Sequence, residues 1–217
     1  GADGLILLES PKDFQDDFSM VYFNADGKES SMCGNGGRCI ARFAKKLGIV
    51  KSEAKFTAID GPHTAIVEEE MVRLKMGDVT EIKSSQEAYF LNTGSPHLVI
   101  FTEEIDAINV KSKGAKIRYS EEYKKEGTNV NFVEIKNGFF AMRTYERGVE
   151  NETLACGTGA VAVALAAHFS GKTSSKKIVL ETLGGKLSVD FEKTSGEYRN
   201  IWLNGPAKQV FMGEIVI

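Results

Sequence analysis

The chain has 217 residues, which is enough for one large hydrophobic core or two smaller ones. Its net charge is −3, and no run of Lys and Arg is long enough to follow a phosphate backbone, so we expect no nucleic-acid partner. The longest purely apolar run, residues 160–167, is far shorter than the about 20 residues that span a bilayer, so we expect no membrane partner. Three cysteines are too few for a disulfide scaffold and favour a cytoplasmic location.

Strands and helices are predicted from hydrophobic runs taken in chain order. A helix is expected where a small-residue or amphipathic stretch ends at a glycine, at 37–48 (GRCIARFAKKLG) and 159–171 (GAVAVALAAHFSG). A short basic stretch, KSKGAK at 111–116, lies between strand-like segments and is interpreted as a solvated loop. Runs rich in β-branched and aromatic residues predict strands at 19–23, 65–69, 72–76, 138–145 and 177–182.

These elements form an internal repeat with an offset of 123 residues. When Cys33 is placed over Cys156, CGNGG falls on CGTGA, and residues 60–67 fall on 183–190. Each copy reads as strands, a Cys-Gly-x-Gly turn, a helix and a strand hairpin. The repeat predicts an α+β protein of two similar halves.

The second copy has a preceding block that the first copy lacks. Residues 91–101 (LNTGSPHLVIF) lie about 35 residues before GTNVNF, whereas nothing precedes residue 1. We therefore expect about 35–40 residues of the first half to be missing from this sequence.

A cysteine at the start of each repeated helix indicates a chemical role. Unpaired N–H groups and the helix dipole stabilise a thiolate there, and the glycines let backbone amides approach an anion. If both helix starts face one cleft, one thiolate can remove a proton from a carbon while the opposite thiol delivers one. Cys39 lies on another face of its helix and is expected to be a buried core residue. No spacing typical of metal ligands occurs, and the mechanism needs neither a metal nor a cofactor.

The motifs FNADG (23–27), CGNGGRC (33–39), YERG (145–148) and ACGTGA (155–160) together resemble the diaminopimelate epimerase family. Those enzymes interconvert LL- and meso-diaminopimelate, a precursor of lysine and peptidoglycan, without pyridoxal phosphate. The resemblance implies two pseudo-symmetric domains, each a curved, mostly antiparallel sheet or barrel around a central helix. It implies a first domain of residues 1–77 plus 207–217, a second of 78–206, and an active site in the cleft between them.

The resemblance also implies roles for individual residues. Cys33 and Cys156 correspond to the two catalytic acid/bases, and His97 and Glu146 to the catalytic residues beside those thiols that assist in deprotonating them. The positions that match the family's substrate-binding residues are Asn24, Gly34, Asn35, Ser95, Asn129, Glu146, Arg147, Gly157 and Thr158. Many members carry Gln at the position of Gly4 and Asn at that of Ser95, so the distal end of the substrate is expected to be held differently here.

Other functions fit parts of the pattern. A proline racemase or hydroxyproline epimerase would use a similar thiol pair without requiring a second amino group on its substrate. A non-catalytic carboxylate-binding protein would use the helix starts only as anion sites, and a thiol redox sensor would form a reversible disulfide. The sequence does not decide between a monomer and a homodimer.

Overall fold

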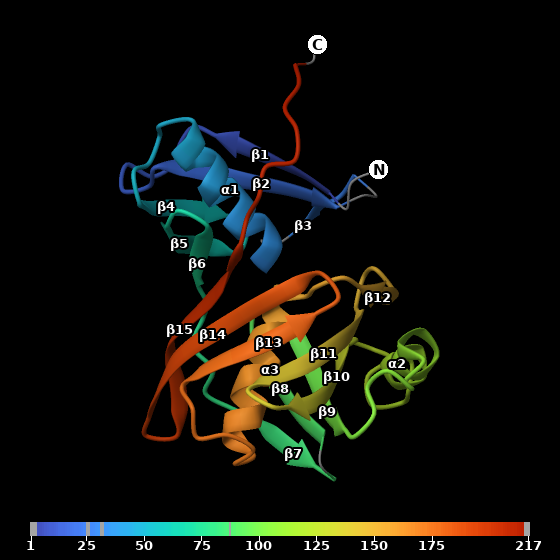
Figure 1. The fold of residues 1–217 in the computed structure, drawn as a ribbon. Helices are drawn as coiled ribbons and strands as arrows, with labels where there is room; N and C mark the ends of the chain where they lie inside the picture. Colours follow the sequence, from blue (N-terminus) through green and yellow to red (C-terminus); the bar gives the residue numbers. More distant parts are fainter. Residues whose placement is uncertain (1–3, 25–26, 31–32, 87, 215–217) are drawn as a thin grey trace. The chain divides into compact units, whose positions relative to one another are not determined.

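The computed structural model describes residues 4–24, 27–30, 33–86 and 88–214 (Figure 1). The chain folds into two compact units. Unit 1 comprises Gly1–Leu74 and Gly205–Ile217, and unit 2 comprises Lys75–Asn204.

Unit 1 consists of a sheet with one helix against it. The strands lie in the order β1-β2-β4-β5-β6, with β3 paired to β2, and the pairs are antiparallel except for the parallel pair β2–β4. The elements are β1 (Gly4–Glu9), β2 (Phe18–Asn24), β3 (Glu29–Ser30), α1 (Gly34–Lys46), β4 (Glu53–Ala58), β5 (Gly61–Val67) and β6 (Met71–Lys75).

Helix α1 is amphipathic, and a glycine with a positive φ angle follows its C-terminal end. Its buried face includes Ile40, Ala41 and Ala44, and this face packs against β1 and β5. Gly48 follows the helix with φ +76°, a backbone conformation that a residue with a Cβ atom adopts at a cost. The amide of Ile49 then donates to the carbonyl of Ala44, which satisfies one of the last helical acceptors.

Unit 2 has a larger sheet in the order β15-β14-β13-β11-β10-β9-β8-β7, with β12 paired to β11. The pairs β9–β10 and β11–β13 are parallel, and the others are antiparallel. The elements are β7 (Lys83–Ser85), β8 (Ala88–Asn92), β9 (Pro96–Thr102), α2 (Val110–Arg118), β10 (Asn129–Lys136), β11 (Phe139–Glu146), β12 (Asn151–Thr153), α3 (Gly157–Phe169), β13 (Lys177–Thr182), β14 (Gly185–Thr194) and β15 (Glu197–Pro206).

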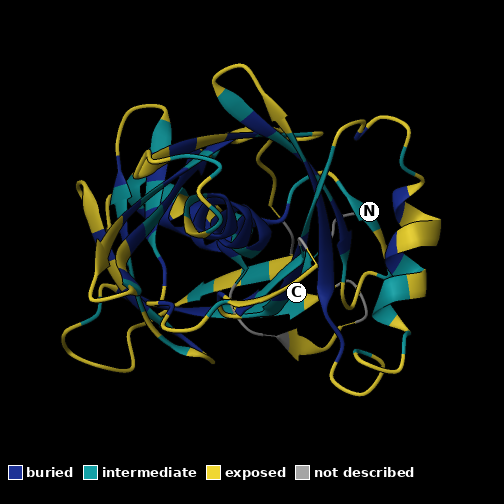
Figure 2. Cartoon of the chain, turned by 90° about the horizontal axis from the view of Figure 1, so that it is seen from below, coloured by how far each residue is buried: buried dark blue, intermediate teal, exposed yellow. Residues whose placement is uncertain are grey.

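Helix α3 is the core of unit 2. It is apolar on every side because small and aliphatic residues fill positions 160–167, all of which are fully buried. It packs against β8, β9, β10, β11, β13 and β14. Figure 2 shows this helix nearly end-on, dark blue, with strands around it. The α+β fold class expected from the sequence is confirmed, with a mostly antiparallel sheet around a central helix in this unit.

The strand pairing also bears out the internal repeat. Helices α1 and α3 are both 13 residues long and begin 123 residues apart. The pairs β1–β2, β2–β3, β2–β4, β4–β5 and β5–β6 have the same directions as β10–β11, β11–β12, β11–β13, β13–β14 and β14–β15. Strands β7–β9 and helix α2 are additional to this pattern.

The interpretation of residues 111–116 as a solvated loop is wrong. Residues 111–116 (KSKGAK) lie within helix α2 and do not form a loop. Asn109 caps this helix by accepting a hydrogen bond from Ser112 N at 3.0 Å. Gly114 lets the helix approach the sheet, since a Cβ atom there would lie 2.4 Å from Tyr145 Cβ. A basic stretch with a central glycine looks unstructured in isolation, and these long-range contacts make it helical.

Candidate active site

Cys33 occupies the cap position at the start of α1. Its backbone is extended (φ −98°, ψ 149°), and its carbonyl accepts the first helical hydrogen bond, from Gly37 N. The half-buried Sγ atom accepts a hydrogen bond from Gly36 N at 3.1 Å. A Cβ atom on Gly36 would lie 3.1 Å from the sulfur, so glycine gives the amide room to approach. A donor directed at sulfur favours the thiolate.

A buried arginine lies close to this thiol. Arg38 Nη1 donates to Gly34 O and Nη2 to Asn35 Oδ1, both at 2.9 Å, while Nε is buried without a partner. Burial lowers the pKa of Arg38, and negative charge on Cys39 and Cys33 opposes that shift. The cation in turn favours a negative charge on the sulfur of Cys33.

The prediction for Cys39 is wrong, because its side chain is exposed on α1. The face of α1 that is buried carries Ile40, Ala41 and Ala44, and Cys39 lies outside it. A cysteine in an amphipathic helix is often buried, but whether it is buried depends on its angular position around the helix, and Cys39 lies outside the buried face of α1.

Cys156 occupies the N-cap position of α3, but unlike that of Cys33 its side chain makes no capping hydrogen bond. Its backbone is extended (φ −118°, ψ 113°), and its carbonyl accepts from Ala160 N at 2.9 Å. The side chain is 6% exposed. Its Sγ atom lies 3.6 Å from Thr158 Oγ1, which is within hydrogen-bonding distance for sulfur.

His97 lies beneath the start of α3 and is fully buried. Its Nε2 atom is 2.9 Å from Thr158 Oγ1, and its Nδ1 atom is 3.2 Å from Asn131 Nδ2. Burial, together with the charge of Arg147, lowers the pKa of His97 to about 3. His97 is therefore neutral at physiological pH and reaches the thiol of Cys156 through Thr158.

Three of the expected substrate-binding residues, Ser95, Asn129 and Arg147, meet in one cluster. Asn129 Nδ2 donates to Ser95 Oγ and to Pro96 O, both at 2.9 Å, and Asn129 Oδ1 accepts from Arg147 N at 2.8 Å. The exposed Arg147 guanidinium donates to Glu126 O at 3.0 Å and lies 3.4 Å from Ser95 Oγ. Since Ser95 Oγ accepts these hydrogen bonds, its own hydrogen is available to an acceptor such as a carboxylate.

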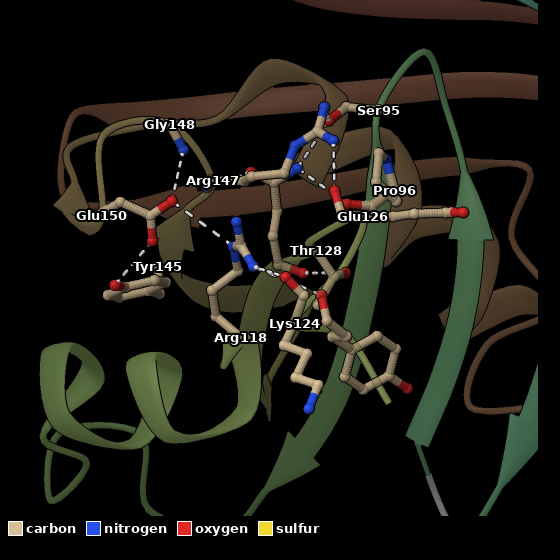
Figure 3. A network of polar contacts seen from close by, with 12 residues as sticks. Ser95, Pro96, Arg118, Lys124, Glu126, Thr128, Tyr145, Arg147, Gly148 and Glu150 are labelled. Atoms are coloured by element: carbon tan, nitrogen blue, oxygen red, sulfur yellow. Dashed lines mark hydrogen bonds and ion pairs between the residues drawn. The ribbon is translucent and has the colours of Figure 1, made fainter. Parts of the chain in front are cut away.

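The turn that carries Glu146 and Arg147 is held by a second acid. Glu150 accepts from Gly148 N at 3.1 Å and from Tyr145 Oη at 3.0 Å (Figure 3). Burial alone would raise the pKa of Glu150, but the hydrogen bonds from Gly148 and Tyr145 and the charge of Arg118 lower it. Glu146 Oε2 accepts from Thr153 Oγ1 at 2.8 Å, which orients its carboxylate.

The remaining expected residues occupy the ends of elements. Asn24 is the exposed last residue of β2, and Gly34 and Gly157 are the buried first residues of α1 and α3. Asn35 is half-buried in the first turn of α1. At Gly4 a Cβ atom would lie 2.5 Å from both Phe23 O and Tyr22 Cε2, so a glutamine would need the neighbouring strand to move.

Sequence reasoning missed Asn131, which is fully buried and hydrogen-bonded to His97. Asn131 lies two residues after Asn129 in β10, and residues two apart in a strand share a face. The alternation of side chains along β10 could therefore have indicated Asn131 from the position of Asn129.

The described residues contain no group of three or more His, Cys, Asp or Glu side chains that could hold a metal ion. Within the same residues, no helix has the length and apolar character needed to cross a membrane.

Comparison with known proteins identifies the family of this chain. The sequence profile of the diaminopimelate epimerase family matches residues 1–82 and 89–210. The diaminopimelate epimerase of Flavobacterium psychrophilum is 52% identical, over 97% of this chain and 82% of the relative. The fold is similar to that of a Bacillus anthracis phenazine biosynthesis protein of the PhzF family (TM-score 0.78, 15% identity, 100% and 86% coverage). It is also similar to that of a probable proline racemase from Agrobacterium radiobacter (TM-score 0.70, 16% identity, 99% and 76% coverage). The chain belongs to the diaminopimelate epimerase family.

Proposed function

We propose that this protein interconverts LL- and meso-2,6-diaminopimelate with Cys33 and Cys156 as a thiolate and thiol pair. The observation that supports this most strongly is a cysteine at the N-cap of each repeat-related helix in a chain that belongs to this family. Proton transfer requires both cysteines in the reduced state, which a reducing compartment such as the cytoplasm maintains.

The chemistry needs one sulfur on each face of the reacting carbon. One thiolate takes the α-hydrogen as a proton, so the C–H bond breaks, its electron pair stays on carbon and an S–H bond forms. The other thiol gives its proton to the opposite face, so its S–H bond breaks and a C–H bond of inverted configuration forms. The two sulfurs then exchange roles for the reverse reaction, and no electrons are gained or lost.

Backbone amides supply the electrostatic part of the mechanism. The carbanion next to a carboxylate has enediolate character, and its negative charge is stabilised by the N–H groups in the first turns of α1 and α3. Gly34 and Gly157 begin these turns, and their lack of side chains leaves space for a carboxylate at the helix start.

The cluster of Ser95, Asn129 and Arg147 suits the amino-acid end that does not react. Arg147 offers an exposed guanidinium and Ser95 a hydroxyl hydrogen, two donors that a carboxylate accepts. Ser95 has a shorter side chain than the asparagine of many relatives, so we expect a bridging water or a closer approach of the ligand.

The test follows the α-proton of LL-diaminopimelate by NMR in D₂O with reduced protein. We expect this signal to disappear as meso product forms, and the rate to fall at least about a hundredfold in Cys33→Ser and in Cys156→Ser. Cys39→Ser is the matched control, since Cys39 is an exposed thiol in the same helix as Cys33. Exchange that persists in either variant would refute the thiol pair, and turnover of L-proline in place of diaminopimelate would favour the racemase alternative.

A further inference from the structure

The orientation of the Asn131 side-chain amide follows from the hydrogen bonds around it. Its amide group lies 3.0 Å from Leu98 O, and a carbonyl oxygen can only accept, so the atom facing it is the Nδ2 donor. Its Oδ1 atom accepts from Thr144 Oγ1 at 2.9 Å. The Leu98 carbonyl fixes the orientation of the amide, because a flipped amide would direct Oδ1 at an oxygen that cannot donate.

The orientation of Asn131 determines which nitrogen of His97 carries hydrogen. The second Nδ2 hydrogen points at His97 Nδ1, 3.2 Å away, so Nδ1 accepts and carries no hydrogen. Burial and the charge of Arg147 keep the ring neutral, so its single hydrogen is on Nε2. Nε2 therefore donates to Thr158 Oγ1 at 2.9 Å.

The Thr158 hydroxyl completes the chain. Because its oxygen accepts from His97, its own hydrogen is directed elsewhere, and Cys156 Sγ lies 3.6 Å away. A hydroxyl that donates to sulfur stabilises the thiolate over the thiol. Thr93 Oγ1 donates to Thr158 O at 2.8 Å and holds this turn of α3 in place.

We propose that Asn131 is a positioning residue for Cys156: it holds His97 in the Nε2–H tautomer and so directs the Thr158 hydroxyl hydrogen to the thiolate. Its importance for catalysis rests on the proposed function, in which Cys156 acts as a base. His97 then acts as a neutral hydrogen-bond donor and does not itself take up a proton. The arrangement also explains Gly159, where a Cβ atom would lie 2.6 Å from Asn131 Oδ1.

The first experiment is ¹⁵N NMR of the three histidine rings in the whole protein. We expect His97 to show the Nε2–H tautomer and no titration between about pH 5 and 8. In Asn131→Asp the carboxylate accepts from His97 Nδ1, so we expect hydrogen to appear on Nδ1. A wild-type His97 with its hydrogen on Nδ1, or a tautomer unchanged in Asn131→Asp, would overturn the proposal.

The second experiment measures the thiolate directly and does not depend on the folding of the Asn131 variant. The alkylation rate of Cys156 by iodoacetamide is followed against pH by peptide mass spectrometry, with Cys33 as internal reference. In Thr158→Val, which keeps the size of the side chain but has no donor, we expect Cys156 to react about tenfold more slowly on the acidic side of its profile. The plateau at high pH should stay unchanged, and Thr158→Ser should restore the wild-type profile.

An unchanged Cys156 profile in Thr158→Val would contradict the proposal. Neither the NMR nor the alkylation experiment requires turnover. Failure of this chain of hydrogen bonds can therefore be distinguished from failure of the epimerase assignment, which the exchange of the substrate α-proton tests.

Discussion

Helices α1 and α3 begin with the same motif and have the same length, yet their surroundings differ. In α1 one face is buried, Cys33 is half-buried, and its sulfur accepts from a backbone amide beside a buried arginine. In α3 nearly every side is buried, Cys156 is almost inaccessible, and its sulfur faces a hydroxyl. The repeated motif therefore preserves the backbone at both thiols, while the residues that differ between the two helices and the burial of each helix give each sulfur a different chemical setting.

The largest expected effect tests the burial of the two helices. Leu165 is fully buried in α3, and the equivalent position in α1 is Arg42, which donates to Glu68 O and Glu69 O. We expect Leu165→Ala to lower the free energy of unfolding of unit 2 by about 4 kcal/mol because it leaves a cavity. Urea unfolding followed by fluorescence of Trp202, the single tryptophan, measures this. If Arg42→Ala destabilised α1, as measured by hydrogen exchange, as much as Leu165→Ala destabilises unit 2, the contrast in burial between the two helices would be contradicted.

Acid should destabilise unit 2 through His97. Its pKa is about 3 when folded and 6.5 when unfolded, so the unfolded state binds more protons between these values. Stability therefore rises with pH through this window, and we expect His97 to contribute a loss of about 2 kcal/mol between pH 6.5 and 4.5. The urea midpoint from Trp202 fluorescence should fall less with pH in His97→Gln than in the wild type. A midpoint that falls as steeply with decreasing pH in His97→Gln as in the wild type would contradict this prediction.

The equivalent glycines Gly36 and Gly159 offer a direct test of the two helix starts. A Cβ atom on Gly159 would lie 2.6 Å from Oδ1 of Asn131, which hydrogen bonds hold in place. On Gly36 it would meet the flexible end of Ile6 at 3.0 Å. We expect Gly159→Ala to cost about 2 kcal/mol of stability and Gly36→Ala less than about 1, because only the first must displace a buried polar group. Thermal unfolding followed by circular dichroism measures both, and a larger loss at Gly36 would contradict the comparison.

The smallest expected effect concerns the charge beside Cys33. Replacing Arg38 with Met removes a buried cation that favours the thiolate, and we expect Cys33 to be alkylated a few-fold more slowly on the acidic side of its profile. Cys156 in the same molecule is the internal reference and should not change. Arg38→Lys keeps the charge and should retain most of the rate. A change that affects both thiols equally would show that Arg38 acts on the fold and not on Cys33.

Much of the fold could be predicted from local patterns. The repeat with its offset of 123 residues, the two helices that end before Gly48 and Gly171, and the cysteine at each helix start depend on residues close together in the chain. Turn glycines, helix caps and hydrophobic periodicity act over a few residues, so the sequence alone determines them. Local patterns misjudged residues 111–116, which are helical because Gly114 packs against Tyr145.

The surroundings of each functional group depend on the tertiary structure. Cys39 is exposed because its phase in α1 places it off the buried face. Asn131 reaches His97 only because β10 pairs in parallel with β9, a contact between residues 34 apart in sequence. A parallel pair across a helical connection leaves no short-range signal, so the tautomer of His97 and the direction of the Thr158 hydroxyl hydrogen cannot be read from motifs. The two thiols, their helix starts and the Thr158 hydroxyl beside Cys156 follow from the local sequence, because these residues are close together in the chain. The burial of each thiol and the His97 ring behind Thr158 depend on the packing of distant strands.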